Sequence, residues 1–188
     1  MKRSEINAII KDFESKLREF KFALPPFLSF TPEEWAEKGH EYDEIRDNAL
    51  GWDITDYGEG HFDTLGLSLI TIRNGNVHNS KYTKTYAEKI MMLREGQVSP
   101  NHFHWNKMED IINRGGGNLV FRLWNATKDE GLDDTDVEIC RTALYGPRRQ
   151  RDHPGPRRVP LPLPLLLPRV LRPARDRLRH HRRGVHVQ

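Results

Sequence analysis

The stretch GQVSPNHFHWNKMEDIINRGG, residues 96–116, decides the fold of this chain. It carries His102, His104 and Glu109, and a glycine stands at each end. On a β-strand the two imidazoles point to the same side, because the side-chain period is two. Glu109 must then return from the following strand or turn. This spacing predicts three ligands for one divalent metal ion, with the glycines at the sharp turns that let the ligands converge.

The chemistry of these ligands limits the metal. Neutral imidazole together with carboxylate suits Mn, Fe, Co, Ni or Zn, and no thiolate is near to favour a softer ion. An octahedral ion with three or four protein ligands keeps positions open for substrate oxygens. Two histidines at alternate positions are common and usually carry no such role. The glutamate and the flanking glycines make this pattern much more specific.

The segments around this stretch predict short antiparallel strands. Residues 65–72 (LGLSLITI) alternate well enough for a strand, and Asn74-Gly75 supplies the residues of a tight hairpin turn. Further strands are expected at 86–93, 102–105 and 118–124, and one more begins at 136–140. Short antiparallel strands with glycine turns favour a mainly β sandwich or barrel over an α/β fold.

The chain before these strands predicts helices. Residues 4–22 place apolar side chains at helical spacing with charges between them, which predicts an amphipathic helix ended by Leu24-Pro25-Pro26-Phe27. Thr31-Pro32-Glu33-Glu34 combines an N-cap, a proline at the first helical position and a capping-box glutamate. A short helix should run from there to about residue 38. We therefore expect residues 1–64 to be a helical extension packed on a barrel core of residues 65–140.

Length and composition set broader limits. The chain has 188 residues, enough for one domain with a hydrophobic core. It has no apolar run long enough to span a membrane, and its charged N-terminus does not resemble a secretory signal. The only cysteine, Cys140, excludes an internal disulfide framework. These features together predict a cytoplasmic location.

The last part of the chain has a different composition. Residues 1–140 contain 17 Lys+Arg and 25 Asp+Glu, whereas residues 141–188 contain 13 Arg, no Lys or Glu, and two Asp. Eight of the 12 prolines follow residue 146, and the segment has no helix or strand period. Proline blocks both helical propagation and ladder hydrogen bonding. We therefore expect residues 141–188 to be a disordered Arg/Pro-rich tail.

Two explanations of this tail are open. It is either a basic arm for nucleic acid or a frameshifted segment that was never selected as protein, since GC-rich DNA read out of frame yields this composition. A shift of one nucleotide can re-read residues 184–188 as the peptide EVSTS and residues 151–153 as GTI. Both peptides resemble ordinary strand-and-turn sequence, although the freedom of codon choice makes this only suggestive. The frameshift is the preferred explanation.

The residues from 84 to 127, KTYAEKIMMLREGQVSPNHFHWNKMEDIINRGGGNLVFRLWNAT, carry a family resemblance. The histidine and glutamate spacing resembles the first motif of the cupin superfamily, and the longer stretch resembles the D-lyxose isomerase family. The resemblance covers residues 1 to about 140. It implies a cupin-type antiparallel β-barrel (jelly roll) with an N-terminal helical extension. It also implies interconversion of D-lyxose and D-xylulose, a preference for manganese, and a homodimer.

By this resemblance, His102, His104 and Glu109 match three of the family's four metal ligands. The fourth ligand is a histidine in a later motif similar to PPGLYH, which this chain does not contain. The family also uses a glutamate near its C-terminus as an acid/base, and no glutamate follows Glu138 here. The barrel is therefore expected to be incomplete in this chain.

Two further residues are candidates for catalysis. Lys89 matches the family's active-site lysine, which implies a role in polarising a sugar oxygen or moving a proton; the alternative is a solvated strand lysine. Asp110, beside Glu109, is a candidate for orienting a ligand histidine, or it is a simple surface carboxylate. Trp105 and Trp124 would suit the wall of a sugar pocket or the core.

The resemblance thus predicts a metal-dependent aldose–ketose isomerase that works through an enediol. Two other functions compete with it. One is an inactive remnant whose barrel does not close and which lacks one ligand. The other is a metal-binding cupin whose Arg-rich arm contacts RNA or acidic surfaces, which predicts steep salt dependence of association; nucleic acid is the less favoured partner.

Overall fold

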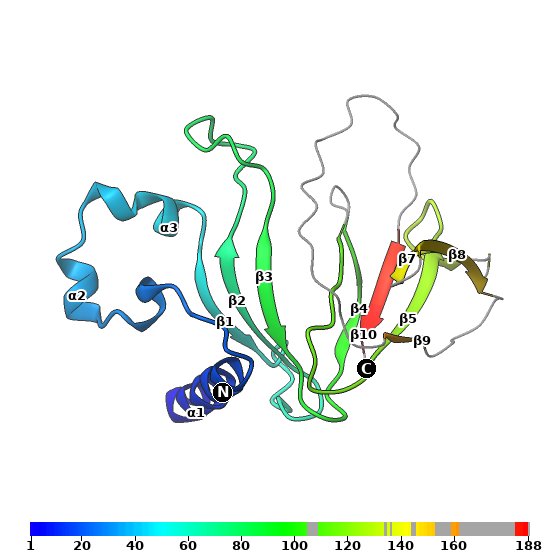
Figure 1. Cartoon of the computed structure of the whole chain (residues 1–188), viewed down its shortest axis with the longest axis horizontal. Coiled ribbons are helices and arrows are strands. Elements are labelled where there is room, and N and C mark those ends of the chain that lie inside the picture. The colour runs from blue at the N-terminus through cyan, green and yellow to red at the C-terminus, as the bar shows by residue number, and fades with distance from the viewer. Residues whose placement is uncertain are drawn as a thin grey trace. The chain divides into compact units, whose positions relative to one another are not determined.

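The computed structural model describes residues 1–104, 109–133 and 135, together with the backbone of strands at 137–143, 146–152, 159–161 and 183–187. The chain forms two compact units, residues 1–98 and 99–188. Antiparallel strands dominate the described elements (Figure 1), which confirms the predicted mainly β fold with helices near the N-terminus. The described strands lie in three separate sheets and do not close into a single barrel.

The first helix, α1 (Arg3–Glu19), is the amphipathic helix that the sequence predicts. Its buried face presents Ile9, Phe13 and Leu17 at helical spacing. The helix ends three residues earlier than expected and well before the prolines. Lys21 takes a left-handed conformation with φ of 54°, and the Phe22 backbone N–H donates to the Leu17 carbonyl at 2.9 Å. This Schellman motif, and not proline, terminates α1.

A series of short helical turns follows α1. It comprises η1 (Pro26–Ser29), α2 (Pro32–Ala36), η2 (His40–Tyr42) and α3 (Asp43–Asp47). The predicted capping box of α2 is present, because the Glu34 backbone N–H donates to Thr31 Oγ1 at 3.2 Å and the Thr31 N–H donates to Glu34 Oε2 at 2.7 Å. α2 is nevertheless shorter than predicted and ends at Ala36.

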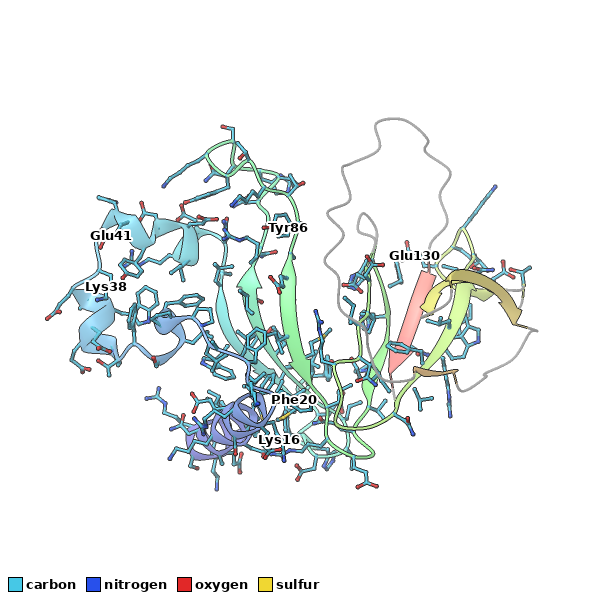
Figure 2. All side chains as sticks on the ribbon, viewed as in Figure 1. Lys16, Phe20, Lys38, Glu41, Tyr86 and Glu130 are labelled. Atoms are coloured by element: carbon cyan, nitrogen blue, oxygen red, sulfur yellow. The ribbon has the colours of Figure 1, made fainter. Side chains whose placement is uncertain are left out.

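Side chains of this helical segment form an aromatic cluster. The rings of Phe30, Trp35 and Tyr42 meet edge to face with centroids 5.4–5.9 Å apart. The ammonium of Lys38, labelled in Figure 2, lies 4.6 Å from the Phe30 centroid. The Arg46 guanidinium lies 5.3 Å from the Trp35 ring and donates to the Lys38 carbonyl at 2.8 Å. Cation–π contacts and carbonyl hydrogen bonds therefore hold the segment together.

The first unit is built on the sheet β1–β2–β3, with β1 (Gly51–Thr55), β2 (Leu67–Arg73) and β3 (Glu88–Met92) antiparallel. α1 covers one face of this sheet. Phe13 and Ile70, which are 1% and 0% exposed, form the centre of the core, and the Phe13 ring meets Trp52 edge to face at 5.7 Å. β1 lies within residues 1–64, for which the sequence predicts a helical extension. It was overlooked because five strand residues are flanked by turn residues on both sides.

The connection between β2 and β3 differs from the prediction. Asn74-Gly75 does not form a tight hairpin turn, because β2 ends at Arg73 and β3 begins at Glu88. Gly75 serves a close approach instead: a Cβ atom at this position would lie 2.5 Å from the Thr85 carbonyl carbon. The two ends of the connection therefore meet where residue 75 has no side chain.

The second unit contains β4 (Ser99–Phe103), β5 (Leu119–Ala126) and β6 (Leu132–Asp133). The backbone of β10 (Arg183–Val187) pairs antiparallel with both β4 and β5, and β9 (Val159–Leu161) also pairs with β5. β7 (Val137–Ala143) and β8 (Gly146–Asp152) form a separate hairpin. Three strand backbones thus fall within the tail for which the sequence predicts disorder. The rest of residues 153–182 lies outside the described residues, and the frameshift stays a prediction.

Candidate metal centre

A tight turn leads the chain into the strand that carries the histidines. Gly96 has φ of 72°, which fits the prediction of a sharp turn at this glycine. The side chain of Gln97 is buried and spans the turn. Its Oε1 accepts the Arg94 backbone N–H at 2.9 Å, and its Nε2 donates to the Phe62 carbonyl at 2.5 Å. A buried amide with both ends paired holds a turn in one conformation.

The two histidines lie at the end of β4. His102 is within the strand and His104 follows its last residue. Their ring centroids are 5.1 Å apart at an interplanar angle of 68°. The His102 Nδ1 atom lies 2.8 Å from the Pro100 carbonyl oxygen, which can only accept a hydrogen bond. In a neutral ring this leaves Nε2 of His102 with the lone pair that a metal needs.

Glu109 returns to His104 after the next few residues. Its Oε2 atom lies 3.3 Å from Nε2 of His104, and the two side chains are 33% and 31% exposed. Adjacent ligands of one octahedral ion, each about 2.1 Å from it, would be about 3 Å apart. The donor types and this separation therefore suit two neighbouring positions on a divalent ion.

The complete set of three ligands is not assembled. Within residues 1–104 and 109–133, no group of three His, Cys, Asp or Glu side chains is placed to hold a metal ion. The structure brings His104 and Glu109 together and places the ring of His102 beside that of His104. Ligation by all three residues stays a prediction. Trp105 lies outside the described residues.

Asn113, which was not predicted from the sequence to have a role, holds the glycine-rich turn after Glu109. Asn113 Nδ2 donates to the Gly117 carbonyl at 2.9 Å, and its Oδ1 accepts the Gly115 backbone N–H at 3.0 Å. Gly116 has φ of 90°, as the predicted turn requires. An Asn followed by glycines is a turn signal that could have revealed this role. The turn directs the chain from Glu109 into β5.

The candidate catalytic residues are exposed. Asp110 follows Glu109 in the loop. Trp124 lies in β5 and is half-buried. Lys89 belongs to the first unit, where it lies on β3 directly opposite Thr71. The roles of Lys89 and Asp110 stay predictions.

Comparison with known proteins identifies the family. The family model for D-lyxose isomerase matches residues 1–148. The chain belongs to the D-lyxose isomerase family. It is 44% identical over 160 residues to a D-lyxose/D-mannose isomerase of Escherichia coli O157:H7, and this alignment covers 82% of the chain and 70% of that protein. A D-lyxose/D-mannose isomerase of Serratia proteamaculans matches with the same identity and coverage.

Two further findings bear on the sequence-based expectations. The family match ends at residue 148, shortly after the composition changes at residue 141. Among the described residues, no helix combines the length and the apolar character that crossing a bilayer requires.

Proposed function

We propose that this chain derives from a metal-dependent aldose–ketose isomerase that interconverts D-lyxose and D-xylulose. Membership of the D-lyxose isomerase family supports the reaction class. The observation that carries the metal dependence is the approach of Glu109 Oε2 to His104 Nε2 at 3.3 Å, beside the ring of His102. Manganese is the ion that we propose because the family resemblance implies it; imidazole and carboxylate without thiolate suit it as they suit Fe, Co, Ni or Zn.

Each residue has a distinct task in this proposal. His102, His104 and Glu109 would hold the ion, and the Pro100 carbonyl would fix the tautomer of His102. The chemistry that a bound divalent ion supplies is polarisation of the sugar carbonyl and stabilisation of negative charge on its oxygen. Asp110 would orient a ligand histidine.

The proton must move from C2 of the aldose to C1 of the ketose. A base removes the C2 proton to give an enediol, and the proton is returned at C1. Lys89 would assist by moving a proton at a sugar oxygen. The family's base is a C-terminal glutamate, and no glutamate follows Glu138 in this chain.

A second candidate, an inactive remnant, is favoured by one observation. The family match stops at residue 148, and the remaining sequence contains no motif similar to PPGLYH that could supply the fourth ligand. We therefore expect the chain as it stands to show little or no turnover, and a version with its reading frame restored after residue 140 to be active.

Turnover assays of both versions test the proposal. Each is loaded with manganese and assayed for D-xylulose formed from D-lyxose, with D-mannose as a second substrate. The restored version should be active and should lose activity in His102→Ala, whereas His61→Ala, which changes an exposed histidine, should leave it intact. An inactive restored version would refute the isomerase, and equal, robust turnover by the chain as it stands would refute the frameshift.

The proposal includes an assembly and a location. We propose a homodimer on the basis of the family resemblance, which sedimentation of the restored version would test. We also propose a cytoplasmic location, which the presence of a single cysteine in the sequence favours. Localisation of a tagged chain would test it.

A further inference from the structure

The short helix α3 and the residue after it make repeated contacts with the connection between β2 and β3. We call residues 43–48 the α3 platform. Tyr82 Oη donates to Asp47 Oδ2 at 2.5 Å, and Lys81 Nζ lies 3.4 Å from Asp43 Oδ2. Figure 1 shows α3 and this connection at the same end of the sheet. The platform therefore holds the middle of the connection.

The platform also holds the point where β2 ends. The Arg73 guanidinium forms an ion pair with Glu44. The next residue, Asn74, donates from Nδ2 to the Asn48 carbonyl at 3.0 Å. Four platform residues thus contact the chain between residues 73 and 82, at both its start and its middle.

The pairing of β2 with β3 is irregular beside this anchor. Thr71 lies opposite Lys89 and Arg73 lies opposite Glu88, so Ile72 has no partner on β3. An extra residue on one strand is a β-bulge, which re-aims neighbouring side chains and occurs often beside active sites. Lys89, the candidate catalytic lysine, lies opposite Thr71, the residue directly before the unpaired Ile72.

Lys89 leaves the sheet on the face that α1 does not cover. Its neighbour Ile90 packs against the core formed with Phe13 and Ile70. Because side chains alternate along a strand, Lys89 lies on the opposite face. The Lys89 side chain is therefore not expected to be oriented by contacts with this core. Its direction must depend on the bulge and on the anchored connection.

The energies of the platform contacts suit positioning better than stability. The paired side chains are partly exposed; Lys81 is 55% and Glu44 is 45% exposed. Ion pairs in such places contribute about 0–1 kcal/mol each to stability. Several weak contacts that converge on one connection still restrict its conformation.

We propose that the α3 platform positions Lys89. Glu44 and Asp47 hold the connection at its start and at its middle, and thereby fix the bulge at Ile72 and the direction of Lys89. Glu44 and Asp47 are positioning residues, since they act through Lys89. The catalytic consequence rests on the proposed isomerase function, whereas the structural claim does not.

The reactivity of the Lys89 amine tests the proposal on the full chain without any turnover. The rate at which limiting acetic anhydride acylates Lys89 is measured by mass spectrometry in Glu44→Gln and Asp47→Asn. We expect this rate to change by about two- to fivefold, the range that an exposed ion pair can supply. Glu19→Gln is the matched control, because it removes the exposed Lys16–Glu19 pair on α1 and should leave the Lys89 rate unchanged.

Charge reversal separates positioning from general loss of structure. Arg73→Glu and Glu44→Arg should each change the Lys89 rate, and the double variant should restore it, while acylation of Lys11 on α1 stays constant. An unchanged Lys89 rate in Glu44→Gln and Asp47→Asn, or no recovery in the double variant with native circular dichroism, would overturn the proposal. If the Lys89 rate responds in these variants while the frame-restored version turns over no sugar, the isomerase function fails and the positioning role stands.

Discussion

The helix-covered sheet of the first unit and the histidine-bearing segment of the second are held in different ways. Phe13 and Ile70 are almost fully buried, and several apolar side chains pack against them. His104 and Glu109 are about one-third exposed and approach each other directly. Hydrophobic packing is non-directional and redundant, whereas a ligand pair depends on single atoms. The first region should therefore govern stability and the second should govern metal binding.

The largest expected effect is in the helix-covered sheet. Phe13→Ala removes a buried ring that meets Trp52 at 5.7 Å, and should lower the free energy of unfolding by about 3–5 kcal/mol. Urea denaturation measures the change. Phe20→Ala is the control, because Phe20 is 49% exposed at the end of the same helix (Figure 2). Equal losses in both variants would contradict the assigned core.

The second region should show the reverse behaviour. His104→Ala should weaken manganese binding by more than about 100-fold, since even partners of ligands cost 10–100-fold. The free energy of unfolding of the metal-free chain should change by less than about 0.5 kcal/mol. Electron paramagnetic resonance of free manganese measures the affinity, and His61→Ala serves as the control. Unchanged affinity in His104→Ala would remove the candidate metal centre.

A smaller effect in the opposite direction is expected where α1 ends. Lys21 has φ of 54°, a conformation that costs an ordinary residue more than glycine. Lys21→Gly should therefore raise the free energy of unfolding by about 0.5–1 kcal/mol. Lys11→Gly, at an exposed position inside α1, should lower it by about 1 kcal/mol. Thermal denaturation of the two variants should show shifts of opposite sign.

The smallest effect is the pH dependence of the α3 platform. The hydrogen bond to His40, together with the nearby Lys81 ammonium, lowers the pKa of Asp43. Its stabilising contribution is present above about pH 4 and is lost as pH falls through the lowered pKa. The Arg46 guanidinium also faces this carboxylate, at 3.7 Å.

The alkaline side of the platform has the opposite sign. The hydrogen bond to Asp47 raises the pKa of Tyr82, and the hydrogen bond to Tyr82 raises the pKa of Lys81. These contributions are present below about pH 10 and are lost as pH rises through the raised values. The free energy of unfolding, measured by urea denaturation across pH, should lose its alkaline dependence in Tyr82→Phe and its acidic dependence in Asp43→Asn. Identical profiles in all three chains would argue against this assignment.

The two regions also differ in how far the sequence predicts them. α1 and the capping box of α2 were predicted because their signals are local: helical spacing in the first, and Thr31 with Glu34 in the second. β1 was missed because a five-residue strand among turn residues has too short an alternation to stand out. The prediction of a tight turn at Asn74-Gly75 was wrong, because contacts with α3 hold a longer connection between β2 and β3.

The candidate site was predicted by residue type but not by its supports. The spacing of His102, His104 and Glu109 in the sequence indicates metal ligands, but it does not give the distances between their side chains. The Pro100 carbonyl, which orients His102, makes a main-chain contact that any residue could provide. Asn113 had a recognisable turn context and could have been found. The platform contacts of Glu44 and Asp47 join distant parts of the chain, and a single sequence carries no signal for such pairs.

The contact of Gly75 with Thr85 gives the β2–β3 connection a narrow neck. A loop closed at its neck can change its tip without moving the strands below, since longer loops add little closure entropy. Residues 77–80 should therefore accept insertions. Any side chain at position 75 should instead separate residue 75 from Thr85. The length of this loop tip, and with it the molecular surface there, could then change during evolution without altering the register of β2 and β3.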